Sequence, residues 1–317
     1  MNETAYPVRP LVWTTLRPVN RDCEELRRAL AELRKKDANF TVEDEDVDGQ
    51  MTISAMNELH LENICERLVR EHDVYVESGA TNIIYLETIR DTSGAEGKFI
   101  RQSGGSGHYA HVVLRIEPNP TNGYELVSEM PEGAIPEKYL NHIDQGIRQA
   151  LKSGVAGHEM TDLKVILCDG SYHETDSDEA AFESAGFIAM QEAVRQSGAV
   201  LLEPVISLEV SVPQEWAGSV MADLRSRRAD ITGLVGQADK QQLIRAIVRL
   251  ATIVGYADEL RSRTGERATY STALLRYGPV EDAAGDDRIG VTANKPRKPK
   301  PKRGAEAVEL PWPEVDC

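Results

Sequence analysis

Apolar positions in two stretches of this chain, 12–77 and 205–277, repeat the same succession of strand and helix spacings. In the first stretch they predict helices at 21–36 and 58–71 between strands at 11–16, 40–45, 50–55 and 73–77. In the second they predict helices at 214–228 and 256–263 among strands at 205–212, 230–235, 242–249 and 269–276. This order predicts two ferredoxin-like split β-α-β sandwiches within an α+β or α/β multidomain chain.

The two helices of the first stretch have clear apolar sides. Residues 21–36 place Leu26, Ala29, Leu30 and Leu33 on one side, with Asn20 as the expected N-cap. For residues 58–71 we expect Leu59, Ile64 and Leu68 on the buried side, opposite an acidic stripe of Glu58, Glu62 and Glu66. His60 has no second histidine four residues on, so we expect a packing or interdomain residue rather than a metal ligand.

The stretch between the two sandwiches has a different order. Strand spacings at 98–102 and 109–117 are followed by strands near 124–127 and 163–168 and by helices at 136–153 and 177–196. Pro136 suits the first turn of its helix, whose expected buried residues are Ile143, Ile147, Ala150 and Leu151.

A glycine-dense turn, Gly104, Gly105 and Gly107, joins the first two of these strands. A dinucleotide-binding loop requires a helix after its glycines, and the chain contains no G-x-x-x-x-G-K-[ST] phosphate loop. Two interpretations of the turn remain open, a plain tight hairpin and a loop that contacts a partner.

Composition limits the class of protein. The chain has 317 residues, 41% of them hydrophobic and 28% charged, which is typical of two or three globular domains. No apolar run reaches the roughly 20 residues of a membrane span, and we expect a cytoplasmic protein with no membrane partner. Cys23, Cys65, Cys168 and Cys317 form no C-x-x-C pair, so we expect reduced thiols and no metal site.

Charge is unevenly distributed. The net charge is −16, and the acidic excess lies within the first 200 residues, which leaves the second sandwich as the part least repelled by RNA. That sandwich has two groups of cationic residues. Arg225, Arg227 and Arg228 lie at the end of its first predicted helix, and Arg261, Arg263 and Arg267 lie near the end of its second. Their spacing fits two roles equally, domain packing near the helix dipoles and contact with RNA phosphates.

Five sequence blocks, in order, resemble the elongation factor G family of ribosomal translocases. The block GKFIRQSGGSGHYAHV at 97–112 resembles the tip hairpin of domain IV, and DGSYHETDSDEAAF at 169–182 its second tip loop. SAMNELHLE at 54–62 is similar to domain III, and the stretches 201–231 and 255–271 are similar to domain V. In that family a GTPase domain and a β-barrel domain precede these blocks. The chain therefore resembles the factor without its GTPase domain.

The resemblance implies a domain plan. It implies a domain III-like unit at 1–82, a domain IV-like unit with the fold of ribosomal protein S5 at 83–200, and a domain V-like unit at 201–278. Residues 279–317 have no counterpart in the family, and their Lys/Pro-rich composition predicts a disordered tail. The cations of 294–303 suit either RNA contact or solvation.

The resemblance also implies which residues make contact. The tip residues expected near the tRNA and the decoding site are Ser103, Gly104, Gly105, Ser106, Gly107, His108, Tyr109, Tyr172, His173 and Asp176. The residues expected to contact rRNA are Arg225, Arg227, Arg228, Arg261 and Arg263, with Glu58 and His60 as interdomain residues of domain III. His173 has no nucleophile or metal set beside it, so we expect a positional role and no catalysis.

The first tip loop departs from the family pattern GGRGQYGH. Ser106 and His108 stand where the family usually has Arg and Gln, which removes a fixed positive charge. Contacts with the RNA backbone are therefore expected to be weaker or different from those of the family.

The functional expectation is a ribosome-binding protein or fragment of translation elongation, with no small-molecule substrate and no cofactor of its own. GTP and magnesium would enter only through a GTPase domain in a longer chain or through a separately encoded GTPase. Two other interpretations stay open. One is a ribosomal protection or regulatory protein, since tetracycline-resistance proteins share the domain order; the other is a scaffold that no longer binds the ribosome.

Overall fold

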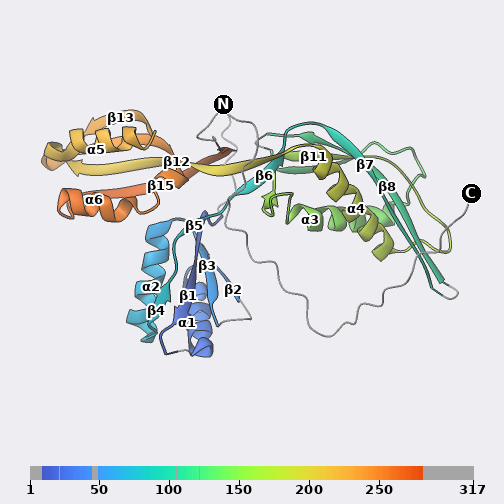
Figure 1. The fold of residues 1–317 in the computed structure, drawn as a ribbon, viewed down its shortest axis with the longest axis horizontal. Coiled ribbons are helices and arrows are strands. Elements are labelled where there is room, and N and C mark those ends of the chain that lie inside the picture. The colour runs from blue at the N-terminus through green and yellow to red at the C-terminus, as the bar shows by residue number, and fades with distance from the viewer. Residues whose placement is uncertain (1–8, 21, 45–48, 104–105, 121, 281–317) are drawn as a thin grey trace, which may run out of the picture.

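The computed structural model describes residues 9–280 apart from 21, 45–48, 104–105 and 121. Within this part, six α-helices and three β-sheets form three units, and the mixed α/β multidomain class is confirmed. Figure 1 shows the first unit below, the second to the right and the third to the left.

The first unit is a split β-α-β sandwich. Its elements are β1 (Val12–Pro18), α1 (Cys23–Lys36), β2 (Thr41–Asp44), β3 (Met51–Ala55), α2 (Glu58–His72), β4 (Val76–Ser78) and β5 (Asn82–Ile83). The sheet order is β2-β3-β1-β4, with β5 also paired to β1. This is the ferredoxin-like order predicted from the sequence.

Two details of these helices differ from the prediction. Asp22, not Asn20, is the N-cap of α1, because its Oδ1 accepts the N–H of Glu25 at 2.9 Å, while the Asn20 side chain accepts the N–H of Asp22. On α2, Leu61 and not Leu59 lies on the buried side with Ile64 and Leu68, because residues 61, 64 and 68 share one helical stripe.

The second unit has a sheet in the order β7-β8-β11-β9. Its strands are β7 (Ser93–Ser103), β8 (Ser106–Pro118), β9 (Tyr124–Ser128) and β11 (Leu163–Ser171), and its helices are α3 (Leu140–Leu151) and α4 (Glu179–Gln196). The helix predicted from Pro136 begins instead with a 3₁₀ turn at Glu137–Tyr139, because Pro136 has an extended ψ of 138°.

Glycines let α4 pack closely against both α3 and β7. A Cβ built on Gly146 of α3 would overlap the backbone carbonyl of Glu183 on α4, and one on Gly97 of β7 would overlap the carbonyl of Ala185. The predicted buried residues of α3, Ile143, Ile147, Ala150 and Leu151, all lie in this core.

The third unit is a second split β-α-β sandwich. Its elements are β12 (Ala199–Pro213), α5 (Gln214–Ser226), β13 (Asp230–Gly236), β14 (Gln241–Arg249), α6 (Tyr256–Thr264) and β15 (Thr269–Pro279). β15 and β14 flank β12, and β13 is the outer strand beyond β14. From residue 281 the predicted tail lies outside the described residues.

Strand β12 joins the second and third units. It begins at Ala199, six residues before the predicted strand, and its first residues pair with β6 (Leu86–Ile89), which pairs in turn with β10 (Glu159–Met160). From residue 202 it pairs with β15 and from Val205 with β14. The predicted boundary between residues 200 and 201 therefore falls inside one continuous strand (Figure 1).

The buried apolar residues form two clusters. One is shared by the first and third units, so that β3 and α2 belong to the same core as β12 and α6. The other lies between the helices and sheet of the second unit. The first and third units are thus packed directly on each other.

Candidate nucleic-acid interface

The hairpin of β7 and β8 is paired up to its last described residues. Ser103 and Ser106 are the last residue pair of the ladder. The predicted contacts at Gly104 and Gly105 lie outside the described residues, and only the backbone of Ser103 and Ser106 is described.

The second loop, 172–178, packs against this hairpin. The N–H of Tyr109 donates to the carbonyl of Asp176 at 2.7 Å, and Ser177 Oγ donates to the carbonyl of Tyr109 at 2.7 Å. A Cβ on Gly107 would lie 2.9 Å from Asp176 Cγ, so a larger residue there would displace the Asp176 side chain. The bonds of Tyr109 with Asp176 and Ser177 join the second loop to the hairpin.

His173 is displayed at the surface of the second loop. Its backbone N–H donates to Ser177 Oγ at 2.8 Å, and its Nδ1 lies 3.1 Å from Thr175 Oγ1 and 3.3 Å from Asp176 Oδ2. The His173 side chain is 60% exposed and that of Tyr172 is also exposed. The hydrogen bonds hold the loop in shape and leave both rings open to a partner.

His108 is tied to the N-terminus of α4. Its Nδ1 contacts Asp178 Oδ2, while Asp178 Oδ1 accepts the N–H of Ala181 at 2.8 Å as the N-cap of the helix. Burial acts to raise the pKa of the Asp178 carboxyl, but the hydrogen bonds from Ala181 and His108 outweigh it, and the pKa is lowered. No local sequence pattern indicates this contact, because Asp178 lies 70 residues from His108 in the chain.

Arg227 lies at the centre of a packing cluster in the third unit. Its guanidinium donates to Asp223, to Glu259 and to the carbonyl of Thr252, and lies 5.0 Å from the ring centre of Tyr256. The side chain is only 17% exposed. These partners all belong to its own unit, as the packing interpretation expects.

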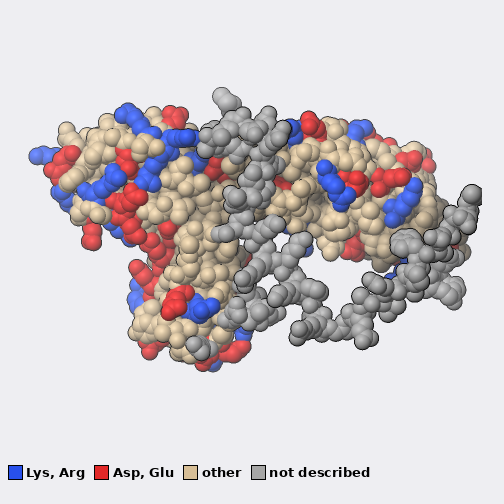
Figure 2. All heavy atoms as spheres, viewed as in Figure 1, with Lys and Arg blue, Asp and Glu red and all other residues tan. Residues whose placement is uncertain are grey.

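Two more of the predicted arginines are also paired. Arg263 lies 3.1 Å from Asp223 Oδ1, and Arg261 lies 3.4 Å from Glu62 Oε2 of the first unit. Figure 2 shows basic and acidic side chains side by side on the visible face of the third unit. The basic groups here are largely balanced by neighbouring carboxylates.

Arg225 and Arg228 differ from these three. Both are exposed, and within the described part of the chain their side chains make no hydrogen bond or ion pair. Arg228 has a φ of 60° and ends α5 in a Schellman motif, with its N–H bonded to the carbonyl of Arg225 and the N–H of Ala229 bonded to that of Leu224. These two guanidinium groups face solvent.

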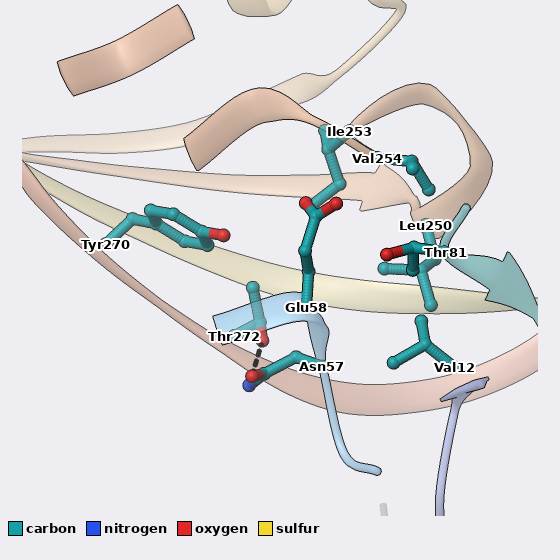
Figure 3. A pocket seen from close by; sticks show the side chains of 9 residues that line it. All are labelled: Val12, Asn57, Glu58, Thr81, Leu250, Ile253, Val254, Tyr270 and Thr272. Carbon is teal, nitrogen blue, oxygen red and sulfur yellow. Dashed lines mark hydrogen bonds between the residues drawn. The ribbon is translucent and has the colours of Figure 1, made fainter. Parts of the chain in front are cut away.

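The interface between the first and third units contains Glu58. Glu58 Oε2 accepts the N–H of Gly255 at 2.8 Å, and Asn57 Nδ2 donates to Thr272 Oγ1 at 3.2 Å beside it. Figure 3 shows Asn57 and Glu58 in the small pocket at this junction, with the ring of Tyr270 nearby.

His60 remains within the first unit. Its Nε2 lies 2.9 Å from Asp37 Oδ2, and its ring is edge-on to Phe40. Of the two residues predicted to be interdomain, Glu58 lies in the junction and His60 packs beside the end of α1.

Neither a metal cluster nor a membrane span emerges from the described residues. No group of three or more His, Cys, Asp or Glu side chains in that part could hold a metal ion. None of its helices is both long and apolar enough to cross a membrane.

Family models assign the three units. Residues 9–80 match domain III of elongation factor G, residues 81–198 match its domain IV, and residues 200–288 match its C-terminus. The chain belongs to the elongation factor G family. None of the three matched domains is the GTP-binding domain of that family, so the domains present lack the GTPase.

A solved structure has the same arrangement. A crystal structure of a protein from Thermus thermophilus is 35% identical, with a TM-score of 0.71 over 88% of this chain. The chain spans 42% of the length of that protein. The paired loops around Tyr109 and Asp176 therefore lie in domain IV of the elongation factor G fold, and the exposed Arg225 and Arg228 lie in its C-terminal domain.

Proposed function

We propose that this chain is a ribosome-binding module of translation elongation, which acts in the cytoplasm and contacts RNA with domain IV and the C-terminal domain. The observation that carries the proposal is the joining of the two tip loops by the bonds between Tyr109, Asp176 and Ser177. These bonds bring Tyr172, His173 and His108 to one end of a long hairpin, where polar and aromatic groups suit contact with a nucleic acid.

The C-terminal domain supplies the electrostatic part of the proposal. Arg225 and Arg228 lie three residues apart at the end of α5, exposed and without side-chain partners in the described part of the chain. A guanidinium presents a planar set of donors that matches phosphate, and each phosphate contact makes binding more sensitive to salt.

The proposal includes no GTP hydrolysis by this chain. A GTP-binding domain in a longer protein, or a separately encoded GTPase, would supply that step to domains III, IV and V. The residues proposed to contact tRNA and mRNA near the decoding site are those of the tip, and the residues proposed to contact rRNA are the exposed arginines.

Co-sedimentation with vacant ribosomes tests the proposal. We expect binding at low salt that weakens at moderate salt, and a clear further loss in the double variant Arg225→Glu/Arg228→Glu. Arg227 is left intact, because its contacts hold the C-terminal domain together.

A matched control makes the same change of charge elsewhere. Arg34 and Lys152 are exposed, without side-chain partners in the described residues, so Arg34→Glu/Lys152→Glu alters net charge equally. We expect this control to bind like the unchanged protein. Absence of binding at either salt would overturn the proposal and favour a scaffold that does not use the ribosome.

A further inference from the structure

A cleft lies between α2 of domain III and α6 of the C-terminal domain. Its volume is about 410 Å³, and the segment 78–81 between β4 and β5 forms its third wall. Thr14 Oγ1 donates to the carbonyl of Gly79 at 2.9 Å, which holds that wall against β1. The volume is in the range of pockets that bind ligands. The cleft is therefore a groove, built by two domains, that another segment can enter.

The charge of this cleft is negative. Glu58, Glu62 and Glu66 line it from α2 and Asp258 lines it from α6, with Arg261 as the one basic residue among its lining residues. Arg261 lies 3.4 Å from Glu62 Oε2 and 3.5 Å from Asp258 Oδ1. Glu66 makes no hydrogen bond or ion pair within the described part of the chain. Figure 2 shows acidic side chains gathered where the left and lower units meet. One guanidinium thus serves four carboxylates in what we call the acidic cleft.

The excess of negative charge affects the groups that it surrounds. Burial raises the pKa of the Glu62 carboxyl; Arg261 opposes the rise, whereas Asp258 and Glu58 add to it. Burial also raises the pKa of the nearby Tyr270 to about 12, with a contribution from Glu58 and Glu62. A cation in the acidic cleft would relieve the repulsion among these carboxylates.

The same chain contains a segment of opposite charge. Residues 294–303, NKPRKPKPKR, have six cationic side chains, no acidic one and three prolines. We call them the basic segment. Proline has no backbone N–H, so such a segment is poorly suited to extend a sheet, and a partner would bind it mainly through its cationic side chains. Carboxylates on facing walls of a groove are suitable partners for those side chains.

The end of β15 lies near the acidic cleft. Tyr277 Oη donates to the carbonyl of Ile84 at 3.4 Å, and Thr81, three residues before Ile84, lines the cleft. β15 ends two residues after Tyr277, at Pro279. Thirteen residues, 281–293, precede the basic segment, and an extended chain of that length spans up to about 43 Å. The basic segment is therefore within reach of the cleft.

We propose that the basic segment docks in the acidic cleft, where its Lys and Arg side chains pair with carboxylates of both domain III and the C-terminal domain. This inference goes beyond the proposed function, which gives the segment no role, and it does not depend on the ribosome. Each exposed charge pair contributes little, but the linker raises the local concentration of the segment at the cleft. While docked, these cations are not free to contact RNA.

The first test maps contacts in the full chain with a zero-length carbodiimide, which joins a lysine amine to a carboxylate that it touches. At low salt, mass spectrometry should find peptides that join the lysines of the basic segment to Glu62, Glu66 or Asp258. The yield should fall at moderate salt, because salt screens partly exposed charge pairs. Cross-links confined to the acidic residues of 281–287 or of 43–48, or none at all, would overturn the inference.

A pair of variants tests whether the charge of the cleft is responsible. Glu62→Gln/Asp258→Asn removes one carboxylate from each domain and both ion pairs of Arg261, so the remaining cross-links to Glu66 should be lost. Glu132→Gln/Glu137→Gln makes the same change of charge in domain IV, at exposed positions without side-chain partners in the described residues. This control should retain the cross-links. Equal yields in the two variants would contradict docking in the cleft.

The second test compares backbone amide signals of α2 by nuclear magnetic resonance. Replacement of all six cations of the basic segment by Gln should shift the signals of residues 58–66 at low salt. Glu306→Gln/Glu309→Gln, which alters the chain beyond the basic segment and leaves its cations in place, should not. Thermal unfolding confirms that each variant is folded. Signals of residues 58–66 that are the same in the six-cation variant and the unchanged protein would also overturn the inference.

Discussion

Glu58 of domain III accepts a 2.8 Å hydrogen bond from the backbone N–H of Gly255, the N-cap residue of α6 in the C-terminal domain. Gly255 has a φ of 76° and no side chain with which to cap the helix. A carboxylate from a different domain therefore lies at the positive end of the α6 dipole. The two domains are stabilised by each other at this point.

Replacement of Glu58 should weaken the junction. We expect Glu58→Ala to lower the free energy of unfolding by about 1–3 kcal/mol, the range for a hydrogen bond to a charged group. Chemical denaturation followed by circular dichroism measures it. Glu66→Ala, at an exposed position on the same helix without a partner in the described residues, should change stability little. Equal losses in the two variants would contradict the role given to Glu58.

Arg227 should matter for stability. Arg227→Ala removes donors to Asp223, Glu259 and Thr252 and leaves two carboxylates without this partner, so we expect a loss of about 2–3 kcal/mol. Thermal and chemical unfolding of the full chain measure the loss. Arg225→Ala, exposed at the same helix end, should be nearly neutral. A neutral Arg227→Ala would mean that the cluster does not hold the domain.

Arg228 should contribute to ribosome binding and not to stability. Its backbone is left-handed, a conformation that glycine adopts without cost, so Arg228→Gly should raise stability by roughly 0.5–1 kcal/mol while removing a cation. Ribosome binding should nevertheless weaken. Asparagine at the same position, which also tolerates this conformation, provides a check that the loss of charge is responsible.

The contact between α3 and α4 should not tolerate a methyl group. We expect Gly146→Ala to destabilise domain IV by about 1–3 kcal/mol, because its Cβ would overlap the backbone of Glu183 and the helices would have to separate. Gly218→Ala is the control, since nothing lies within 4 Å of a Cβ built there, and alanine is the better helix former. Unfolding curves of the two variants should therefore shift in opposite directions.

Glu71 should contribute to acid sensitivity. Hydrogen bonds from Lys36 and Arg67 lower the pKa of its carboxyl to about 2, from an ordinary value of 4.5. Because the folded value is the lower one, Glu71 stabilises the fold above pH 4.5, and this contribution is lost as pH falls toward 2.

Unfolding measured between pH 2 and pH 6 checks the sign. Glu71→Gln should flatten the dependence of stability on pH in that window. Glu66→Gln, on the same helix but without an ion pair in the described part, should leave it unchanged. A Glu71→Gln profile as steep as that of the unchanged protein would exclude this contribution.

Local patterns predicted most of the elements. The spacing of Leu26, Ala29, Leu30 and Leu33 identified the buried side of α1, because a helical stripe is a property of neighbouring residues. Caps are harder to identify, since Asn20 and Asp22 both suit the position and only the course of the backbone decides between them. The long β12 was missed in part, because its first residues pair with a strand more than a hundred residues earlier in the chain.

The candidate site shows the same limit. The family resemblance identified both tip loops, but gave no sign that Asp178 would contact His108. The resemblance also grouped five arginines as rRNA contacts, although partners from separate elements distinguish Arg227 from Arg225. Side-chain pairing across distant segments is fixed by packing, which a single sequence does not display.

The course of β12 has a mechanical consequence. Within one six-stranded sheet, β12 pairs with β6 at one end and with β14 and β15 of the C-terminal domain along the rest of its length. The strand itself runs without interruption from Ala199 to Pro213, although its pairing with β15 shifts register between Val205 and Ile206. The junction between domain IV and the C-terminal domain thus lies inside a hydrogen-bonded sheet, so that separating the two domains there would have to break strand pairing, whereas the tip hairpin of β7 and β8 lies in a different sheet.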